Sequence, residues 1–202
     1  MIKNSAFFKL GYGLYVLTVR DAEKDNGCII NTAMQLTSTP QRILLSVNKA
    51  NYTNEVLLRT GLCNINTLTT QTPFSVFEHF GFQSGRTVNK FAECATETRS
   101  ENGLIVLPKY TNACLSAKVV DTYDYGTHTL FIADVTEAKV LSDETSVTYQ
   151  YYQDNIKPKP QPTAKKGWVC KICGYVYEGE TLPPDFICPL CKHGAEDFER
   201  IQ

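Results

Sequence analysis

The sequence predicts a mainly β protein: a Greek-key barrel with a few short helices, followed by a small metal-knuckle domain. Three observations support this prediction. Strand-like runs outnumber helical ones, a proline-rich stretch divides the chain near residue 160, and two CxxC pairs follow that stretch. A chain of 202 residues is long enough for one medium domain and one small module.

The first two predicted strands, residues 13–20 and 28–36, flank Asp25, Asn26 and Gly27. An Asn-Gly step favours a hairpin turn because both residues tolerate positive φ. Alternating or β-branched apolar runs predict further strands at residues 42–48, 62–68, 114–123 and 127–141. Two short helices are expected, one at residues 53–60 before Gly61 and one that starts at Pro73 and stops before Gly81.

Composition and charge exclude several functional classes. Hydrophobic residues make up 43% of the chain, an ordinary proportion for a globular protein. The formal net charge of −1 gives no sign of the basic surface that binds nucleic acid or an anionic membrane. No apolar run reaches the length of a membrane span, and the N-terminal residues lack the apolar region of a signal peptide. We therefore expect a cytoplasmic protein that binds neither nucleic acid nor membranes.

The stretch DNIKPKPQPTAKKG contains prolines at positions 158, 160 and 162 with lysines between them. Alternate prolines cannot continue a helix or an interior strand and favour an extended, solvated chain. This predicts a first domain at residues 1–153, a linker at 154–166 and a second domain at 167–202. A rigid proline-rich loop packed on the first domain is the alternative.

Two cysteine pairs in the second domain have the spacing of a metal site: Cys170 with Cys173, and Cys188 with Cys191. Each CxxC turn places two sulfurs close together, and two facing turns make a tetrahedral cage that accepts either iron or zinc. The spacing alone leaves that choice open. The remaining cysteines sit in apolar or strand-like surroundings and are expected to be buried thiols: Cys28, Cys63, Cys94 and Cys114.

From Trp168 to Glu199 the sequence resembles a rubredoxin. The matching segments are WVCKICGYVY, then CPLCKHG, then Asp197-Phe198-Glu199. The stretch between the two knuckles is shorter than in a free-standing rubredoxin and is similar to the abbreviated module at the end of rubrerythrins. The resemblance implies one iron held by the four cysteines. An iron centre of this kind moves one electron at a time, so a flavin is the expected converter from hydride chemistry.

The first domain has no GxGxxG and no P-loop, so a Rossmann nucleotide site is not supported. Three segments, residues 26–57, 77–91 and 125–135, resemble the flavin-reductase family with an FMN-binding split β-barrel. This resemblance implies FMN, NADH or NADPH as the electron donor, and a homodimer with the flavin at the subunit interface. The fusion also resembles the high-molecular-weight rubredoxins of anaerobic bacteria, which are paired with flavodiiron proteins in oxidative or nitrosative defence.

Three groups of residues are candidates for binding FMN. The first follows an apolar strand and would meet the edge of the flavin ring, unless these are only turn residues: Asn31, Thr32, Ala33, Gln35 and Thr37. The second would hold the phosphate near a helix start, although helix capping explains Thr53 equally well: Ser46, Val47, Asn48, Lys49 and Thr53. The third is a second candidate phosphate grip, or an exposed basic loop: Ser84, Gly85 and Arg86, with Lys90 beyond.

His128 follows a turn in YGTHTLF and precedes a strand. In the family the matching histidine lies near the nicotinamide side of the flavin, so His128 is the candidate catalytic residue, and a satisfied strand histidine is the alternative. His79 is interpreted as structural. Hydride transfer from nicotinamide to flavin needs no acid-base pair, so the absence of a catalytic triad is expected.

The sequence therefore predicts an NAD(P)H-dependent oxidoreductase in which FMN receives a hydride and passes single electrons to iron and then to a partner such as a flavodiiron O2 or NO reductase. Two rivals remain. One is an electron carrier that a separate reductase loads, and the other is a zinc-ribbon binding module on a non-redox barrel.

Overall fold

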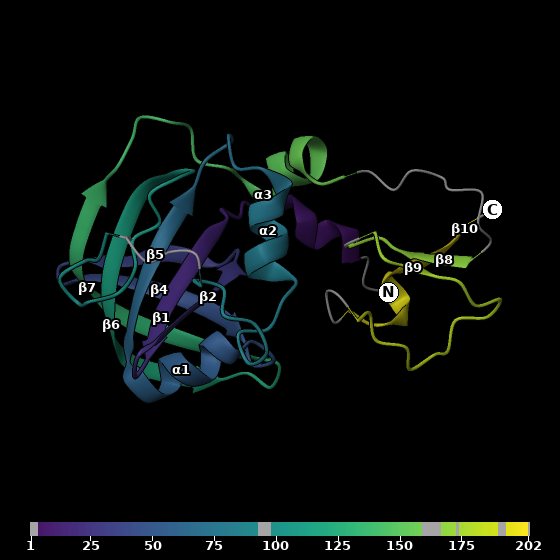
Figure 1. Ribbon diagram of the computed structural model, residues 1–202, viewed down its shortest axis with the longest axis horizontal. Coiled ribbons are helices and arrows are strands. Elements are labelled where there is room, and N and C mark those ends of the chain that lie inside the picture. The colour runs from purple at the N-terminus through teal and green to yellow at the C-terminus, as the bar shows by residue number, and fades with distance from the viewer. Residues whose placement is uncertain (1–3, 93–97, 159–166, 173, 190–192, 202) are drawn as a thin grey trace. The chain divides into compact units, whose positions relative to one another are not determined.

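The computed structural model describes residues 4–92, 98–158, 167–172, 174–189 and 193–201. The chain forms two compact units, residues 1–156 and 157–202 (Figure 1). Asp154, expected to begin the linker, instead lies in a short helical segment, Tyr152–Ile156, of the first unit. Tyr152 is buried there against Phe77, with ring centroids 4.6 Å apart, which explains why the first unit continues to Ile156. Most of the predicted linker lies outside the described residues.

One antiparallel sheet of seven strands forms the first unit, in the order β2-β1-β5-β6-β7-β4-β3. The neighbours β1–β5 and β4–β7 are not consecutive in the chain, as in Greek-key connections. The strands are β1 (Tyr15–Asp21), β2 (Lys24–Ile30), β3 (Ala33–Ser38), β4 (Gln41–Asn48), β5 (Leu62–Leu68), β6 (Thr111–Asp124) and β7 (His128–Val140). The prediction of a mainly β split barrel is confirmed.

Along the strands, alternate side chains point into the apolar core of the barrel, and a second buried cluster forms around Phe77 and Phe80. On β4, Ile43, Leu45 and Val47 are buried whereas their neighbours are not, so the odd-numbered residues face the barrel interior. Phe131 and Ala133 of β7 are fully buried in the same core. The edge strands of the sheet are β2 and β3, and the Tyr15 hydroxyl of β1 donates to the carbonyl of Ala33 at the start of β3.

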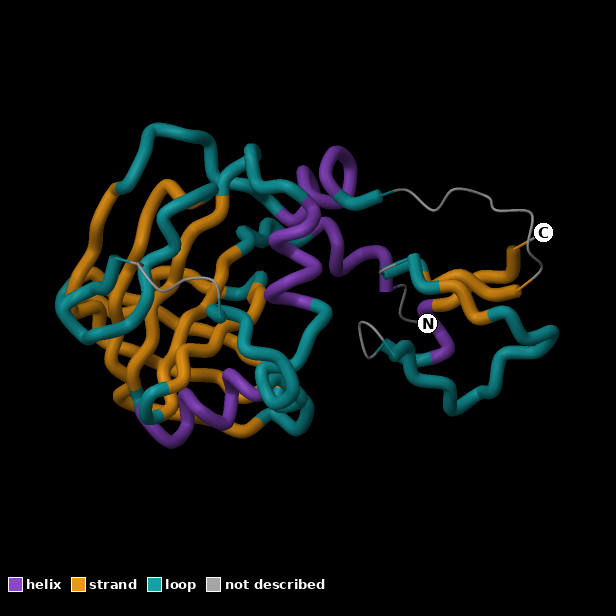
Figure 2. Tube along the Cα trace, in the orientation of Figure 1, coloured by secondary structure: helices purple, strands orange, loops and turns teal. Residues whose placement is uncertain are grey.

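The helices of the first unit are short: η1 (Asn4–Lys9), α1 (Tyr52–Thr60), α2 (Phe74–Gly81) and α3 (Tyr149–Tyr151), followed by η2 (Tyr152–Ile156). Val56 and Leu57 of α1 join the barrel core, so α1 covers one end of the barrel (Figure 2). Gly61 ends α1 in the left-handed conformation, as the sequence predicted. In the parts of the chain that the structure describes, no helix combines the length and apolar character needed to cross a membrane.

The prediction of a turn at Asp25-Asn26-Gly27 is wrong. Asn26 and Gly27 pair within β2 with Val19 and Thr18, and the chain turns instead at residues 22–23. The cause is tertiary, because the Asn26 side chain is buried and its Nδ2 donates to the Thr53 hydroxyl at 2.9 Å. The predicted strand 28–36 is likewise divided into β2 and β3 at residues 31–32.

The second unit contains a three-stranded antiparallel sheet in the order β10-β8-β9. Its elements are β8 (Gly167–Cys170), β9 (Val176–Tyr177), η3 (Ala195–Asp197) and β10 (Phe198–Ile201). Its core is small and built from aromatic side chains around two cysteines. Of the four thiols expected to be buried in the first unit, Cys28, Cys63 and Cys114 are buried, and Cys94 lies outside the described residues.

Candidate cofactor and metal sites

The candidate cofactor residues on β3 and β4 divide between the two faces of the sheet. Thr32 lies opposite Ser46, whose amide donates to the Thr32 carbonyl at 3.1 Å. Asn48 lies opposite His128 on β7. Because alternate side chains share a face, Thr32, Ser46, Asn48 and His128 all point away from the barrel core. The Thr32 hydroxyl also donates to the Asn31 side chain, which places Asn31 beside this outer face.

Three other candidates point the opposite way. Ala33 and Gln35 pair with Leu45 and Ile43, which face the barrel interior, and Val47 is fully buried there. The structure therefore does not bring these three side chains to the outer face. Thr37 lies beyond a bulge near the tip of the β3–β4 hairpin, where its hydroxyl donates to the Pro40 carbonyl.

The helix α1 begins at Tyr52, shortly after β4 ends at Asn48. Asn51, not Thr53, is the N-cap residue, and its side chain makes no capping hydrogen bond. Thr53 lies inside the first turn and its buried hydroxyl accepts from Asn26, so the capping explanation for Thr53 is wrong. A first turn without a side-chain cap leaves backbone amides directed at a potential anion. The Lys49 ammonium is paired with Asp124 at 2.6 Å.

The loop from Ser84 to Arg86 meets the same end of α1. Gly85 packs so closely on Asn26 that an added Cβ would lie 1.9 Å from its Oδ1, so only glycine fits there. The Arg86 guanidinium pairs with Glu55 in the first turn of α1, Nη1 to Oε2 at 2.9 Å. The two groups of candidate phosphate-binding residues therefore lie at the same end of α1.

Arg86 is held by two neighbours on α1. Its guanidinium carbon lies 5.1 Å from the centre of the Tyr52 ring, and its hydrogen bond, together with its charge, keeps the pKa of the Glu55 carboxyl below its usual value. Sequence reasoning missed both Tyr52 and Glu55. Their signal was present but weak, since an acidic residue in a first turn is also ordinary helix chemistry.

Lys90 does not belong to the phosphate grip. Its side chain is buried, and its ammonium donates to the carbonyls of Gly27 and Phe80, each at 2.8 Å. Burial lowers the pKa of Lys90 to about 8. His79 contacts the Lys90 carbonyl at 2.7 Å, in agreement with the structural role expected for it. Lys90 therefore anchors one end of the loop that contains Arg86. The anchor point is the Gly27 carbonyl of β2.

His128 is partly buried at the edge of the outer face. Desolvation lowers the pKa of its imidazole below the usual 6.5, and its Nδ1 lies 2.9 Å from the Thr127 hydroxyl. The ring is therefore neutral at about pH 7 and can donate or accept one hydrogen bond.

In the second unit, Cys170 and Cys188 are both fully buried in the same aromatic core. Their backbones close in the same way, because the Cys170 amide donates to the Tyr175 carbonyl and the Cys188 amide to the His193 carbonyl, both at 2.8 Å and both five residues ahead. Two equivalent knuckles sharing one core fit a tetrahedral thiolate site. Cys173 and Cys191 lie outside the described residues.

A lysine from the start of this unit also lies beside the first knuckle. The Lys157 ammonium donates to the carbonyls of Lys171, at 3.0 Å, and Ile172, the two residues between Cys170 and Cys173. Lys157 was expected in a solvated linker, yet its side chain is 9% exposed. A positive charge at this position favours negatively charged metal thiolates.

Comparisons with known proteins match both units. Residues 7–159 match the model of the flavin reductase like domain, and residues 168–199 match that of the rubrerythrin, rubredoxin-like domain. A high molecular weight rubredoxin of Moorella thermoacetica is 36% identical, with 97% of this chain and 98% of the relative covered. An Archaeoglobus fulgidus protein named ferric-chelate reductase (NAD(P)H) is 35% identical over 79% of this chain and 94% of its own.

Solved structures agree with the fold of the first unit. A flavoredoxin from Methanosarcina acetivorans superposes with a TM-score of 0.60 at 20% identity, covering 69% of this chain and 74% of that one. An NADH:FAD oxidoreductase of Streptomyces globisporus gives a TM-score of 0.61 at 20% identity, covering 71% and 84%. Structural similarity at about 20% sequence identity shows that the first unit has the split-barrel fold, and it shows the fold alone.

Proposed function

Because this chain belongs to the flavin reductase-like family and ends in a rubredoxin-like domain, we propose that it is an NAD(P)H-dependent electron-transfer oxidoreductase. In the proposal, bound FMN accepts a hydride from NAD(P)H and releases its electrons singly to iron held by four cysteines. The observation that carries the proposal is the presence, in one chain, of a flavin-reductase barrel and a four-cysteine module. The relative that shares both parts supports it.

The outer face of the barrel is the proposed flavin site. Thr32, Ser46 and Asn48 offer hydroxyl and amide groups to the ring, next to His128. The first turn of α1 and Arg86 then bind the phosphate, with Arg86 turning from Glu55 to the phosphate oxygens. This assignment uses only the candidate residues that the structure brings together.

An anaerobic reduction experiment tests the proposed function directly. When the purified oxidised protein is mixed with NADH or NADPH, the flavin band should bleach first and the ferric-thiolate band should follow. A flavin that stays oxidised with both nucleotides on the turnover timescale would favour a carrier loaded by a separate reductase. A colourless protein with stoichiometric zinc would instead favour the non-redox alternative.

Replacing Arg86 with glutamine should weaken FMN binding by about tenfold or more, because a charge-assisted hydrogen bond to phosphate contributes about 1.5–3 kcal/mol. Riboflavin, which lacks the phosphate, should bind the variant and the wild type equally well. Dissociation constants from flavin fluorescence quenching on the apoprotein provide the measurement. Equal weakening for both ligands would mean that Arg86 acts through the fold and not through the phosphate.

Replacing His128 with asparagine should raise KM for NAD(P)H more than it lowers kcat, because His128 is proposed to position the nicotinamide. In the wild type, desolvation keeps the pKa of His128 below 6.5, so the rate of flavin reduction should be constant above about pH 7 and change only below pH 6.5. Rapid-mixing kinetics across this pH range test both points. A pH dependence that persists unchanged in the variant would assign the titration to another group.

A homodimer with the flavin at its interface is also part of the proposal. Apolar side chains lie on the same outer face, among them Met34, which is 59% exposed, and the partly exposed Leu44 and Ile132. Exposed apolar surface beside polar groups is typical of an interface. The family resemblance supplies the expectation of a dimer.

Replacing Met34 with aspartate should convert the dimer to a monomer, because it places a charge in the apolar contact. Sedimentation velocity on the FMN-loaded protein is the measurement. The control is Leu58→Asp, a similarly exposed position on α1 away from this face. A monomeric wild type, or a Met34→Asp protein that sediments as a dimer, contradicts this interface.

The electron acceptor is proposed to be a partner protein of the flavodiiron class, on the resemblance to high-molecular-weight rubredoxins. A second candidate acceptor follows from the relative named as a ferric-chelate reductase, which aligns over 79% of this chain. Ferric chelates would then take electrons from the flavin without the iron module. Assays with each acceptor under anaerobic conditions distinguish the two.

A further inference from the structure

A cavity of about 420 Å³ opens at the end of the barrel opposite α1. The two ends of strands β1 and β4 show where the cavity lies. Tyr15 and Arg42, near the starts of these strands, line the cavity, whereas Asp21 and Asn48, at their ends, lie beside α1. The cavity and the proposed phosphate site therefore lie at opposite ends of the barrel.

The cavity is lined by other residues than those of the proposed flavin site. Ala33, Gln35 and Ile43 line it, and they alternate along β3 and β4 with Thr32 and Ser46, which do not. Met34 and Arg42, at alternate positions of the same strands, also contribute to the lining. Side chains that alternate along a strand lie on opposite faces of the sheet. Thr32, Ser46, Asn48 and His128, which are proposed to face the flavin, therefore lie outside the lining of the cavity.

Core side chains form the floor of the cavity. Ile43 and Ile65 belong to the buried core of the barrel, and the partly buried Leu115 and Val135 pack against that core. Val147, which is 1% exposed, completes the apolar wall. The interior of the barrel is therefore left unfilled at this end, and the volume lies within the range of about 300–1,000 Å³ typical of small-molecule sites.

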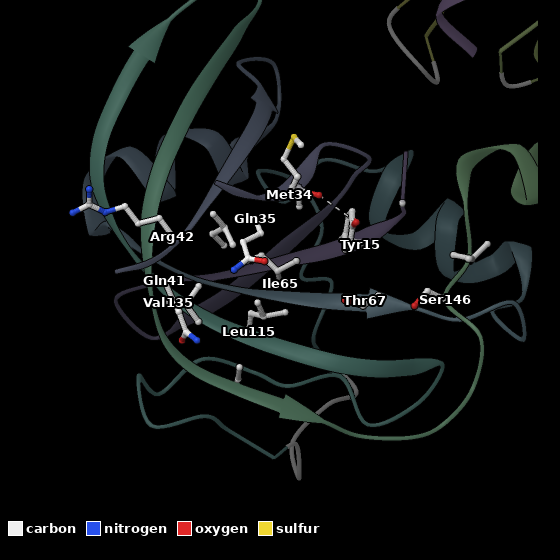
Figure 3. A pocket seen from close by; sticks show the side chains of 15 residues that line it. Tyr15, Met34, Gln35, Gln41, Arg42, Ile65, Thr67, Leu115, Val135 and Ser146 are labelled. Atoms are coloured by element: carbon white, nitrogen blue, oxygen red, sulfur yellow. Dashed lines mark hydrogen bonds between the residues drawn. The ribbon is translucent and has the colours of Figure 1, made fainter. Parts of the chain in front are cut away.

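Polar groups gather at the mouth of the cavity, and they are almost all neutral. Gln35, Gln41, Thr67 and Ser146 contribute amides and hydroxyls (Figure 3). Among the described residues of the lining, Arg42 is the one that carries a charge, and its Nε is paired with Asp134 at 2.7 Å. Figure 3 shows its guanidinium extending away from Gln35, Ile65 and Leu115.

We infer that this cavity is a second ligand site, distinct from the flavin site, for an uncharged and mainly apolar small molecule with a carbonyl or hydroxyl group at one end. The apolar floor accepts the body of the ligand, and the amides of Gln35 and Gln41 at the mouth hydrogen-bond its polar end. A carboxylate or an ammonium group would lose its hydration without gaining an opposite charge, so charged analogues are excluded.

The test compares two bicyclic probes of similar shape, 1-acetylnaphthalene, which is uncharged, and 1-naphthoate, which is an anion. Both are titrated by calorimetry into the oxidised protein loaded with FMN and iron. We expect one site per chain for 1-acetylnaphthalene, and binding at least about tenfold weaker for 1-naphthoate. Because FMN is bound throughout, occupation of the flavin site by the probe is prevented.

Two variants on β7 locate the binding. Ala138 is exposed at the cavity mouth, so Ala138→Trp fills the opening without entering the core and should abolish binding of 1-acetylnaphthalene. Val140, two residues further along and 81% exposed, does not line the cavity, so Val140→Trp should leave binding unchanged. FMN content should be the same in both variants and in the wild type.

Several results would overturn the inference. They are the absence of 1-acetylnaphthalene binding to the wild type, binding that survives in Ala138→Trp, equal affinity for the anion, and displacement of FMN by the probe. None of them bears on reduction of the flavin by NAD(P)H, so failure of this inference is distinguishable from failure of the proposed function.

Discussion

Replacing Cys188 with serine should abolish electron delivery to the partner protein while leaving flavin reduction by NAD(P)H nearly unchanged. Cys188 is fully buried in the core of the second unit and is one of the four proposed iron ligands. Serine lacks the soft thiolate that an iron site of this type requires. The flavin site uses residues of the first unit alone, so its half-reaction should not depend on Cys188.

The measurement is anaerobic stopped-flow spectroscopy with NADH or NADPH, followed by mixing with the oxidised acceptor. Cys114→Ser is the matched control, because Cys114 is also a buried cysteine but lies in β6 of the first unit. Burial raises the pKa of the Cys114 thiol to about 11, so it stays protonated and plays no part in the proposed transfer. Acceptor turnover that survives in the Cys188→Ser protein would show that the proposed order of electron flow is wrong.

The same variant separates the two candidate acceptors. If ferric chelates take electrons directly from the flavin, their reduction should persist in the Cys188→Ser protein. If the iron module relays every electron, chelate reduction should be lost together with turnover of the partner protein.

Removing the metal should unfold the second unit and leave the first unit folded. The described core of the second unit is small, with Cys170, Cys188 and Phe198 buried among partly buried aromatic rings. Units of this size seldom fold on a hydrophobic core alone, and metal binding to a four-thiolate site can contribute about 10–16 kcal/mol to folding. The first unit has a large core of its own and no proposed metal ligand.

The single tryptophan of the chain, Trp168, reports on this transition because it lies in β8 of the second unit. Acid release of the metal followed by gel filtration should shift Trp168 emission to longer wavelength, while the bound flavin spectrum is retained after return to neutral pH. Adding ferrous iron anaerobically should restore the emission. A Trp168 signal that is unchanged by metal removal would mean that the aromatic core is sufficient for folding.

Local sequence patterns predicted most of the architecture. The run at residues 62–68 coincides with β5, and Gly61 ends α1 as expected. Period-two alternation of apolar residues depends only on neighbours in the chain, and so do the two CxxC spacings that begin at Cys170 and at Cys188. The mainly β barrel, the small second domain and the family resemblance could therefore be predicted from patterns along the chain.

The position of the first turn could not be predicted in this way. Asn-Gly is a strong local turn signal, but burial of Asn26 against Thr53 and Gly85 requires both Asn26 and Gly27 to lie within β2. The favourable long-range contact outweighs a turn preference of modest size. Lys90 shows the same effect, since a lysine that looked like part of a basic loop is buried against two carbonyls.

The sequence alone therefore determined the class of the fold, the order of its two domains, the cysteines proposed to hold the metal and the residue types offered to a flavin. Only the tertiary structure decided that Arg86 lies beside the start of α1, and that the side chains of Thr32 and Gln35 lie on opposite faces of the sheet. Strand register and side-chain partners depend on residues far apart in the chain, and a pattern read along the sequence does not contain them.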